Sequence, residues 1–219
     1  DEPAGVVTCL LLIRLLAEND DWRPLRDLFR FHVIPSANPD GLHRNGGWLD
    51  PTFDLGRYFL EVQRDLPQDD VEFGYPETPG GAAPGIRPEN VACARFLDDA
   101  APVVSHISLH SIVFTGGAWF LVATDPDRSA YGESFEWLRA SCADEGMPLH
   151  DEDRGGRKGF SRIGPGFHST PTVEGMKAFF EQSGNSRLTG DFRLNSMQYA
   201  MLNWGARYAI VTEVPVVFD

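Results

Sequence analysis

The sequence predicts an α/β fold in which helices cover both faces of a mainly parallel sheet. Segments with strand-like alternation, such as 103–111 and 207–213, alternate along the chain with helix-like segments, such as 129–145 and 196–204. This order of elements is typical of a parallel sheet flanked by helices. Polar residues at the ends of several predicted strands indicate that the sheet carries chemistry at one edge.

Length and composition narrow the classes of function. The 219 residues suit one domain, 1–219, and the 42% hydrophobic and 23% charged residues are an ordinary globular mixture. A net charge of -13 argues against a nucleic-acid partner, because phosphate binding needs a basic surface, and it also disfavours an anionic membrane surface. No apolar run is long enough to span a bilayer and no signal peptide is visible, so a cytoplasmic location is expected. The three cysteines are scattered and odd in number, which predicts neither a disulfide framework nor a zinc-cysteine site.

The segment 103–111 is the central strand of the prediction. Its alternating, β-rich residues end at His110 and Ser111, just before a glycine-bearing stretch. His106 and His110 share a face but lie four residues apart, roughly 13 Å along a strand, so at most one of them binds a given metal ion. The alternative for either residue is a core histidine with a satisfied hydrogen bond.

The remaining elements are predicted from hydrophobic periodicity and from residues typical of turns and helix ends. The run 6–16 is apolar nearly all round and follows Pro3, which predicts a buried helix, and capping of that helix is the alternative role of Glu2. The other expected elements are a strand at 29–35, a turn at 38–41, a surface excursion at 63–85, a helix at 89–101, a strand at 118–124, a long loop at 151–169 and a helix at 172–182.

Three of the predicted strands lead to polar residues. These are Asn38 to Asp40 after the strand 29–35, His110 with Ser111, and Glu213 at the end of the last strand. If these strands run parallel, their carboxyl ends share one edge of the sheet, where open α/β sheets keep their ligands. Packing alone does not explain this coincidence.

Together these motifs resemble the zinc carboxypeptidase family, the carboxypeptidase A-like metallopeptidases. Residues 1–5, Asp-Glu-Pro-Ala-Gly, are similar to the end of the family's first zinc motif. The resemblance implies that Glu2 is a zinc ligand and that a histidine ligand precedes the first residue. It also implies that His110, in Leu-His-Ser, is the last zinc ligand, and that Glu213 is the general base. The Asn-Pro-Asp-Gly segment at Asn38 matches a turn of the family, which makes Asn38 a candidate for substrate binding.

The same resemblance assigns the substrate-binding arginines. The segment 54–59 is similar to the one whose arginine holds the substrate's terminal carboxylate, so Arg57 takes that role. Gly56 replaces an asparagine that helps grip the carboxylate, which is a departure from the family pattern. Arg44 is the candidate for the arginine that polarises the scissile carbonyl. Tyr199 is the nearest residue to the family's substrate-contacting tyrosine, although the local pattern aligns poorly.

The family implies a three-layer fold with a mixed, mostly parallel, twisted sheet. Its first strands would precede residue 1, and whether its last helix follows residue 219 stays open. The implied function is hydrolysis of the C-terminal peptide bond by water activated on Zn²⁺, with Glu213 as base. Two alternatives remain: a zinc amidohydrolase of the aspartoacylase and succinylglutamate desuccinylase type, acting on an acyl-amino acid, or a catalytically inactive binding relative. The oligomeric state is left open.

Overall fold

The structure is a computed structural model, and it describes residues 2–48, 52–66, 69–81, 85–113, 115–124, 131–190 and 192–216. The chain forms two compact units, Asp1–Asp65 and Leu66–Asp219, and each is described by itself. Within the described ranges, no helix combines the length and the apolar character needed to cross a bilayer. Whether 1–219 folds as a single domain stays a prediction.

The first unit is helical. Its helices begin where the sequence supplies helix starts, with a proline in the first turn of α1, α2 and α3, and capping side chains from Asn38 and Asp54. The elements in chain order are α1 (Pro3–Glu18), the short 3₁₀ helix η1 (Asp20–Trp22), α2 (Arg23–Leu28), α3 (Pro39–Arg44) and α4 (Leu55–Glu61).

The helix α1 forms as predicted, but its predicted burial is wrong. Gly5 is its only buried residue, and Val7, Leu10 and Leu11 are each more than half exposed. The continuous apolar run therefore identified a helix correctly without identifying a covering layer. Helix propensity is a local property, whereas burial requires another element of the fold to pack against the side chains.

The predicted strand at 29–35 is also wrong. Residues 29–34 have no regular secondary structure, and no described residue pairs with them as a strand. A strand needs a partner for its backbone N–H and C=O groups, which the local sequence cannot supply. The expected turn at 38–41 is instead the start of a helix, since Asn38 Oδ1 accepts a hydrogen bond from Gly41 N at 2.8 Å.

The second unit is built on a five-stranded sheet of order β1-β5-β2-β4-β3. The pairs β1/β5 and β2/β4 are parallel, and the pairs β5/β2 and β4/β3 are antiparallel. The strands are β1 (Ser105–Ile112), β2 (Trp119–Thr124), β3 (Arg162–Gly164), β4 (Phe167–Ser169) and β5 (Tyr208–Pro215). The longer helices of this unit are α5 (Pro88–Ala100), α6 (Gly132–Asp144), α7 (Val173–Gln182) and α8 (Ser196–Trp204), and its 3₁₀ helices include η2 (Val71–Phe73), η4 (Arg157–Gly159) and η5 (Ser186–Leu188).

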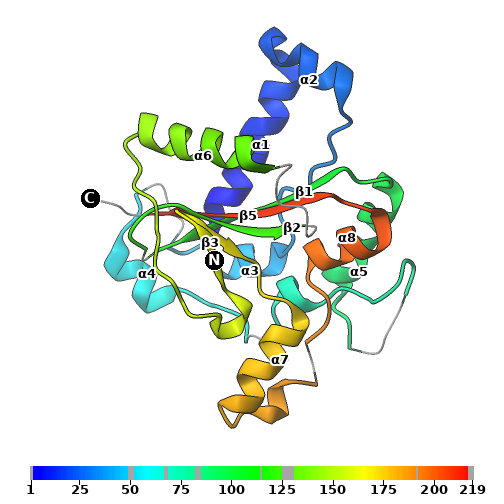
Figure 1. Cartoon of the computed structure of the whole chain (residues 1–219), viewed down its shortest axis with the longest axis vertical. Coiled ribbons are helices and arrows are strands. Elements are labelled where there is room, and N and C mark those ends of the chain that lie inside the picture. The colour runs from blue at the N-terminus through cyan, green and yellow to red at the C-terminus, as the bar shows by residue number, and fades with distance from the viewer. Residues whose placement is uncertain are drawn as a thin grey trace. The chain divides into compact units, whose positions relative to one another are not determined.

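Helices cover both faces of this sheet. On one face, Trp119 of β2 packs in a cluster with Met197 of α8. On the other, Phe120 of the same strand packs with Phe135 of α6. Figure 1 shows α6 on one side of the sheet and α8 on the other. The fold is therefore α/β, with a mixed open sheet between helices, as the sequence predicted.

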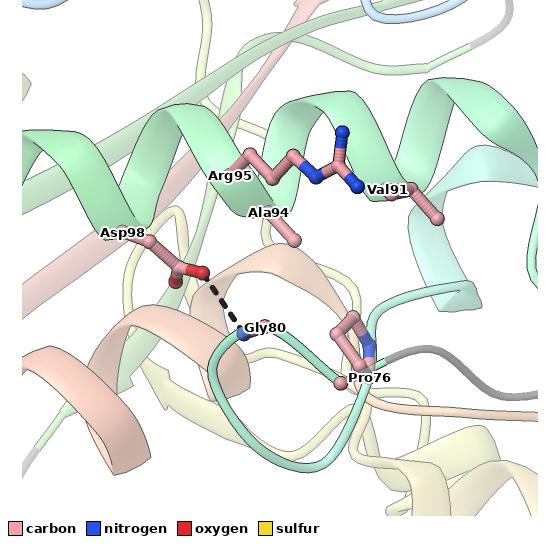
Figure 2. Close-up of a pocket in the computed structure, with 7 residues that line it drawn as sticks. Pro76, Gly80, Val91, Ala94, Arg95 and Asp98 are labelled. Atoms are coloured by element: carbon pink, nitrogen blue, oxygen red, sulfur yellow. Dashed lines mark hydrogen bonds between the residues drawn. The ribbon is translucent and has the colours of Figure 1, made fainter.

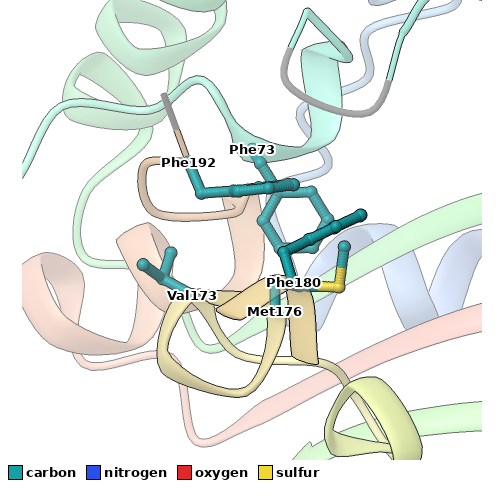
Figure 3. Close-up of a cluster of buried hydrophobic side chains, with 5 residues drawn as sticks. All are labelled: Phe73, Val173, Met176, Phe180 and Phe192. Atoms are coloured by element: carbon teal, nitrogen blue, oxygen red, sulfur yellow. The ribbon is translucent and has the colours of Figure 1, made fainter. Parts of the chain in front are cut away.

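A further apolar cluster surrounds α7, away from the sheet (Figure 3). The ring of Phe180 stacks on Phe192 with centroids 5.3 Å apart, and Phe73 meets Phe192 edge-on at 5.5 Å. Val173 and Met176 of α7 complete the cluster. The predicted surface excursion at 63–85 has mostly exposed or partly exposed residues where the structure describes it, but Phe73, Tyr75 and Pro76 are buried. Its aromatic residues anchor it to the core.

The predicted loop at 151–169 contains a hairpin. Strands β3 and β4 form there, and β4 adds to the sheet beside β2. The fully buried Phe167 stacks on Phe120, with ring centroids 5.0 Å apart. Strands of three residues are too short for an alternating pattern to reveal them, since two alternations also occur by chance.

Candidate active site

His110 and Glu213 lie side by side at the end of two parallel strands. They are register partners in the β1/β5 pair, so their side chains point to the same face of the sheet. Both are half-buried. The expected meeting of these two strand ends is confirmed, and it places an imidazole and a carboxylate on adjacent strands.

Both ring nitrogens of His110 lie beside polar groups of the second unit. Its Nε2 lies 2.9 Å from Ser108 Oγ, and its Nδ1 lies 3.3 Å from Glu72 Oε1. A carboxylate favours a proton on the nitrogen that it faces, which leaves the lone pair of a neutral imidazole on the other nitrogen. Imidazole and carboxylate are both donors that zinc accepts. Among the described residues, however, no three histidine, cysteine or acidic side chains gather as a metal site, so this pair supplies only part of a donor set.

His106, on the same strand, has the surroundings of a core histidine rather than of a metal ligand. Its Nε2 lies 2.9 Å from Ser196 Oγ of α8, and burial lowers its pKa to about 4. A neutral imidazole is therefore the form present near neutral pH. His106 is a core histidine with a satisfied hydrogen bond, and His110 is the histidine of this strand that lies beside Glu213.

In the first unit, Asn38 and Arg44 both bind Asp65. Asn38 Nδ2 donates to Asp65 Oδ2 at 3.0 Å, while its Oδ1 caps α3. Arg44 Nη2 donates to Asp65 Oδ1 at 2.8 Å, with its side chain exposed. This triplet orients the two residues through one carboxylate. Their expected roles toward a substrate and a scissile carbonyl stay predictions.

Arg57 and Glu2 are also placed by helix geometry. Arg57 lies in the first turn of α4, where its Nε donates to Glu61 Oε1 one helical turn later, at 3.0 Å. Glu2 is the residue before α1, but its side chain makes no capping hydrogen bond to that helix. Glu2 is thus the N-cap residue of α1, where its charge still suits the helix dipole, and its role as a zinc ligand rests on the motif.

Tyr199 does not have the surroundings of a substrate-contacting residue. It is 0% exposed, and its hydroxyl donates to Asp98 Oδ1 at 2.6 Å. Burial and the Asp98 carboxylate both raise the pKa of this hydroxyl. Trp204 Nε1 donates to the same carboxylate oxygen at 3.0 Å. The arrangement disfavours the predicted substrate contact and makes Tyr199 a link between α8 and α5.

A small surface pocket borders the other side of Asp98 (Figure 2). Asp98 Oδ2 accepts a hydrogen bond from Gly80 N at 3.1 Å across it. The carboxylate is thus shared by three internal donors and is bound to the fold. The other residues that line the pocket are Pro76, Gly81, Val91, Ala94 and Arg95. This pocket lacks a group poised for chemistry.

The structure adds residues to the site that sequence reasoning missed. Trp119 on β2 is the register partner of Glu213 on β5, so His110, Glu213 and Trp119 form a row across three neighbouring strands. The rings of His150 and His168 meet Trp119 edge-on. Burial, followed by the nearby positive charge of Arg154, lowers the pKa of His150. The only sequence signal for these residues was the density of histidine and charge around 150–168.

Comparison with known proteins gives the family. The family model described as zinc carboxypeptidase matches residues 1–115, which is just over half of the 219 residues. A search of curated proteins and a search of solved structures each found no match. The matched residues include Glu2, Asn38, Arg44, Arg57 and His110. The chain therefore belongs to the zinc carboxypeptidase family.

Proposed function

We propose that this chain is a zinc metallocarboxypeptidase that hydrolyses the C-terminal peptide bond of a peptide, with Glu213 as general base. The observation that carries the proposal is the pairing of His110 with Glu213 at the end of two parallel strands. A metal ligand and a base must both reach the same water molecule, and adjacent strand ends provide that proximity.

The proposed roles follow from the chemistry of each group. His110 binds the metal, with Glu72 beside its other ring nitrogen as an orienting carboxylate. Glu2 is a second ligand on the strength of its motif. Zinc bound there would lower the pKa of a water molecule. Glu213 takes the proton of that water and delivers it to the leaving amine.

The two arginines bind the substrate in this proposal. Arg57 holds the terminal carboxylate, for which a guanidinium offers two parallel hydrogen bonds. Arg44 stabilises the oxyanion that develops on the scissile carbonyl. Each already pairs with a carboxylate, Arg57 with Glu61 and Arg44 with Asp65. Binding a substrate therefore means sharing or exchanging these internal partners.

The test is hydrolysis of a peptide by the zinc-loaded protein and its Glu213→Gln variant. We expect kcat/KM to fall by about 10² to 10⁴ in the variant, because glutamine cannot accept the proton. Zinc content, measured by elemental mass spectrometry, should be unchanged. Glu181→Gln, on the exposed end of α7, is the matched control and should keep full activity.

Two further measurements separate the alternatives. His110→Ala should lose bound zinc as well as activity. An N-acyl amino acid assayed beside the peptide distinguishes an amidohydrolase from a peptidase. Peptide hydrolysis that persists in Glu213→Gln would overturn the assignment of the base, and absence of zinc from the intact protein would overturn the hydrolase.

A further inference from the structure

A group of polar aromatic side chains lies beside Glu213, on the face of the sheet that α8 covers. Trp119 is paired with Glu213 across β2 and β5, so the two side chains project from the same face. The rings of His150 and His168 lie 5.3 Å and 5.4 Å from the Trp119 ring, centroid to centroid. These three residues and Arg154 are here called the Trp119 cluster.

Three ring nitrogens of the Trp119 cluster are buried without a hydrogen-bond partner in the part of the chain that the structure describes. They are Trp119 Nε1, His150 Nε2 and His168 Nδ1. Trp119 is 2% exposed and His168 is 0% exposed. Buried polar atoms in folded proteins nearly always have partners. Three exceptions around one indole indicate that this place is built to receive a polar group.

The hydrogen-bonding capacity of the cluster defines what that group can be. His168 Nε2 lies 2.8 Å from the carbonyl oxygen of Glu152, which only accepts, so Nε2 carries the hydrogen. With the ring hydrogen on Nε2, the Nδ1 atom of His168 is an acceptor, suited to an N–H of a ligand. Trp119 Nε1 can only donate. The cluster thus offers a donor for an oxygen and an acceptor for an amide.

Arg154 adds a positive charge to the cluster. Its guanidinium lies 4.4 Å from the Trp119 ring centre and 5.2 Å from that of Phe160. Within the described ranges, it makes neither an ion pair nor a side-chain hydrogen bond. The neighbouring Asp151 is occupied by Arg162, through two hydrogen bonds of 2.9 Å and 2.8 Å. A guanidinium stacked on rings in this way keeps its N–H edge available for an anion.

Two residues of the cluster reach the surface. His150 and Arg154 are partly exposed, whereas Trp119 and His168 are buried beneath them. The backbone holds His150 in place, because His150 N donates to Ala118 O at 2.9 Å, one residue before Trp119. Arg154 and His150 thus lie nearer the surface than the buried ring nitrogens, and the acidic residues 151–153 directly precede Arg154 in the chain.

We propose that the Trp119 cluster binds an acidic residue of the substrate next to the cleaved bond. The substrate carboxylate pairs with Arg154 and accepts from Trp119 Nε1, and a substrate amide N–H donates to His168 Nδ1. This inference rests on the proposed peptidase function, because it is the pairing with Glu213 that places the cluster beside the reacting bond. It defines the substrate class as peptides with glutamate or aspartate at that bond.

The experiment compares matched peptides on the zinc-loaded protein. The peptides carry glutamate or its uncharged isostere glutamine, at each of the two positions that flank the cleaved bond. We expect kcat/KM to favour glutamate by about 10- to 100-fold at one position, as for a hydrogen bond to a charged group. Arg154→Gln should bring this ratio to about one, because the ionic contact with the glutamate side chain is lost. Arg157→Gln is the control, since Arg157 lies over Phe179 and outside the cluster.

A direct binding measurement tests the acidic subsite independently of peptide hydrolysis. Calorimetry with glutarate and its uncharged match glutaramide, on wild type and Arg154→Gln, requires no turnover. Hydrolysis without a glutamate preference, or a preference that survives in Arg154→Gln, overturns the acidic subsite and leaves the peptidase intact. Absence of hydrolysis together with Arg154-dependent binding of glutarate supports the anion site and overturns the peptidase. If neither ligand binds and no peptide is cleaved, both fail.

Discussion

The two faces of the central sheet are made by alternate residues of the same strands, yet their chemistry is opposite. On the face under α6, Phe167 stacks between Phe120 and Phe135, with ring centroids 5.0 Å and 4.2 Å away. On the face under α8, His110, Glu213 and Trp119 lie in a row across three strands. One face is closed by hydrocarbon, and the other keeps groups that can bind or titrate.

This difference shows that one strand can direct core residues to one face of the sheet and polar residues of a candidate site to the other. Successive side chains point to opposite faces, so a shift of one residue exchanges core for site. In β4, the buried Phe167 belongs to the apolar face, and the next residue, His168, leaves a nitrogen without a partner on the other. Substitutions in the aromatic stack on the α6 face should therefore change stability, and substitutions of the polar residues on the α8 face should change activity or pH dependence.

The largest expected effect on stability is at Phe167. Phe167→Ala removes a fully buried ring that two other rings contact, so the free energy of unfolding should fall by about 3 to 5 kcal/mol in urea denaturation. Leu202→Ala, at a side chain that is 70% exposed on α8, is the control and should change it by less than about 0.5 kcal/mol. Equal effects of the two substitutions would contradict the contrast between core and surface.

A pH effect should distinguish the α8 face. Burial lowers the pKa of His106 to about 4, from an unfolded value of about 6.5. Between these pH values the unfolded chain binds a proton that the native chain does not. The free energy of unfolding should therefore be highest above pH 6.5 and fall as the pH drops toward 4, by up to about 3 kcal/mol.

The measurement for His106 is denaturation at several pH values between 4 and 7. His106→Asn should flatten the pH dependence in this window, because asparagine does not titrate. His43→Asn, at an exposed histidine of α3, is the matched control and should leave the slope as it is in wild type. If the free energy of unfolding changes with pH equally in wild type and in both variants, His106 is not the group responsible.

A smaller effect is expected at Tyr199, and it tests whether this residue supports the fold or contacts a substrate. Tyr199→Phe deletes the hydrogen bond to Asp98 and should lower the free energy of unfolding by about 2 kcal/mol, with kcat/KM unchanged within about twofold. Tyr208→Phe is the control, since among the described residues the Tyr208 hydroxyl has no hydrogen-bond partner. A large loss of kcat/KM with stability preserved would restore the substrate role.

Much of the fold was predictable because the hydrophobic pattern of short segments is sufficient to identify its strands and helices. The strands around His110 and Glu213 and the helices α5, α6, α7 and α8 have the expected positions, with ends that differ by a few residues. The failures share one cause. Among the described residues, the segment 29–35 has no strand partner and Gly5 is the one buried residue of α1, while the hairpin at 162–169 is recognisable only through its pairing with β2. Each depends on a distant segment.

The residues of the candidate site likewise fall into those that local motifs reveal and those that only the tertiary structure brings together. His110 and Glu213 were found because each ends a strand with a recognisable motif. Trp119, His150 and His168 were missed, since their relation to Glu213 arises from strand order and register. Tyr199 was assigned by residue type alone, and the structure shows that its hydroxyl binds Asp98.

The sequence by itself determined the fold class, the family motifs and the two residues at the centre of the candidate site. These are properties of short segments, where periodicity, caps and residue type are sufficient. Only the tertiary structure decided that His110 and Glu213 are neighbours, that His106 is a buried core histidine, and that Arg154 lies over the Trp119 ring. Pairing, burial and electrostatic compensation depend on residues far apart in the chain, and folding is what brings them together.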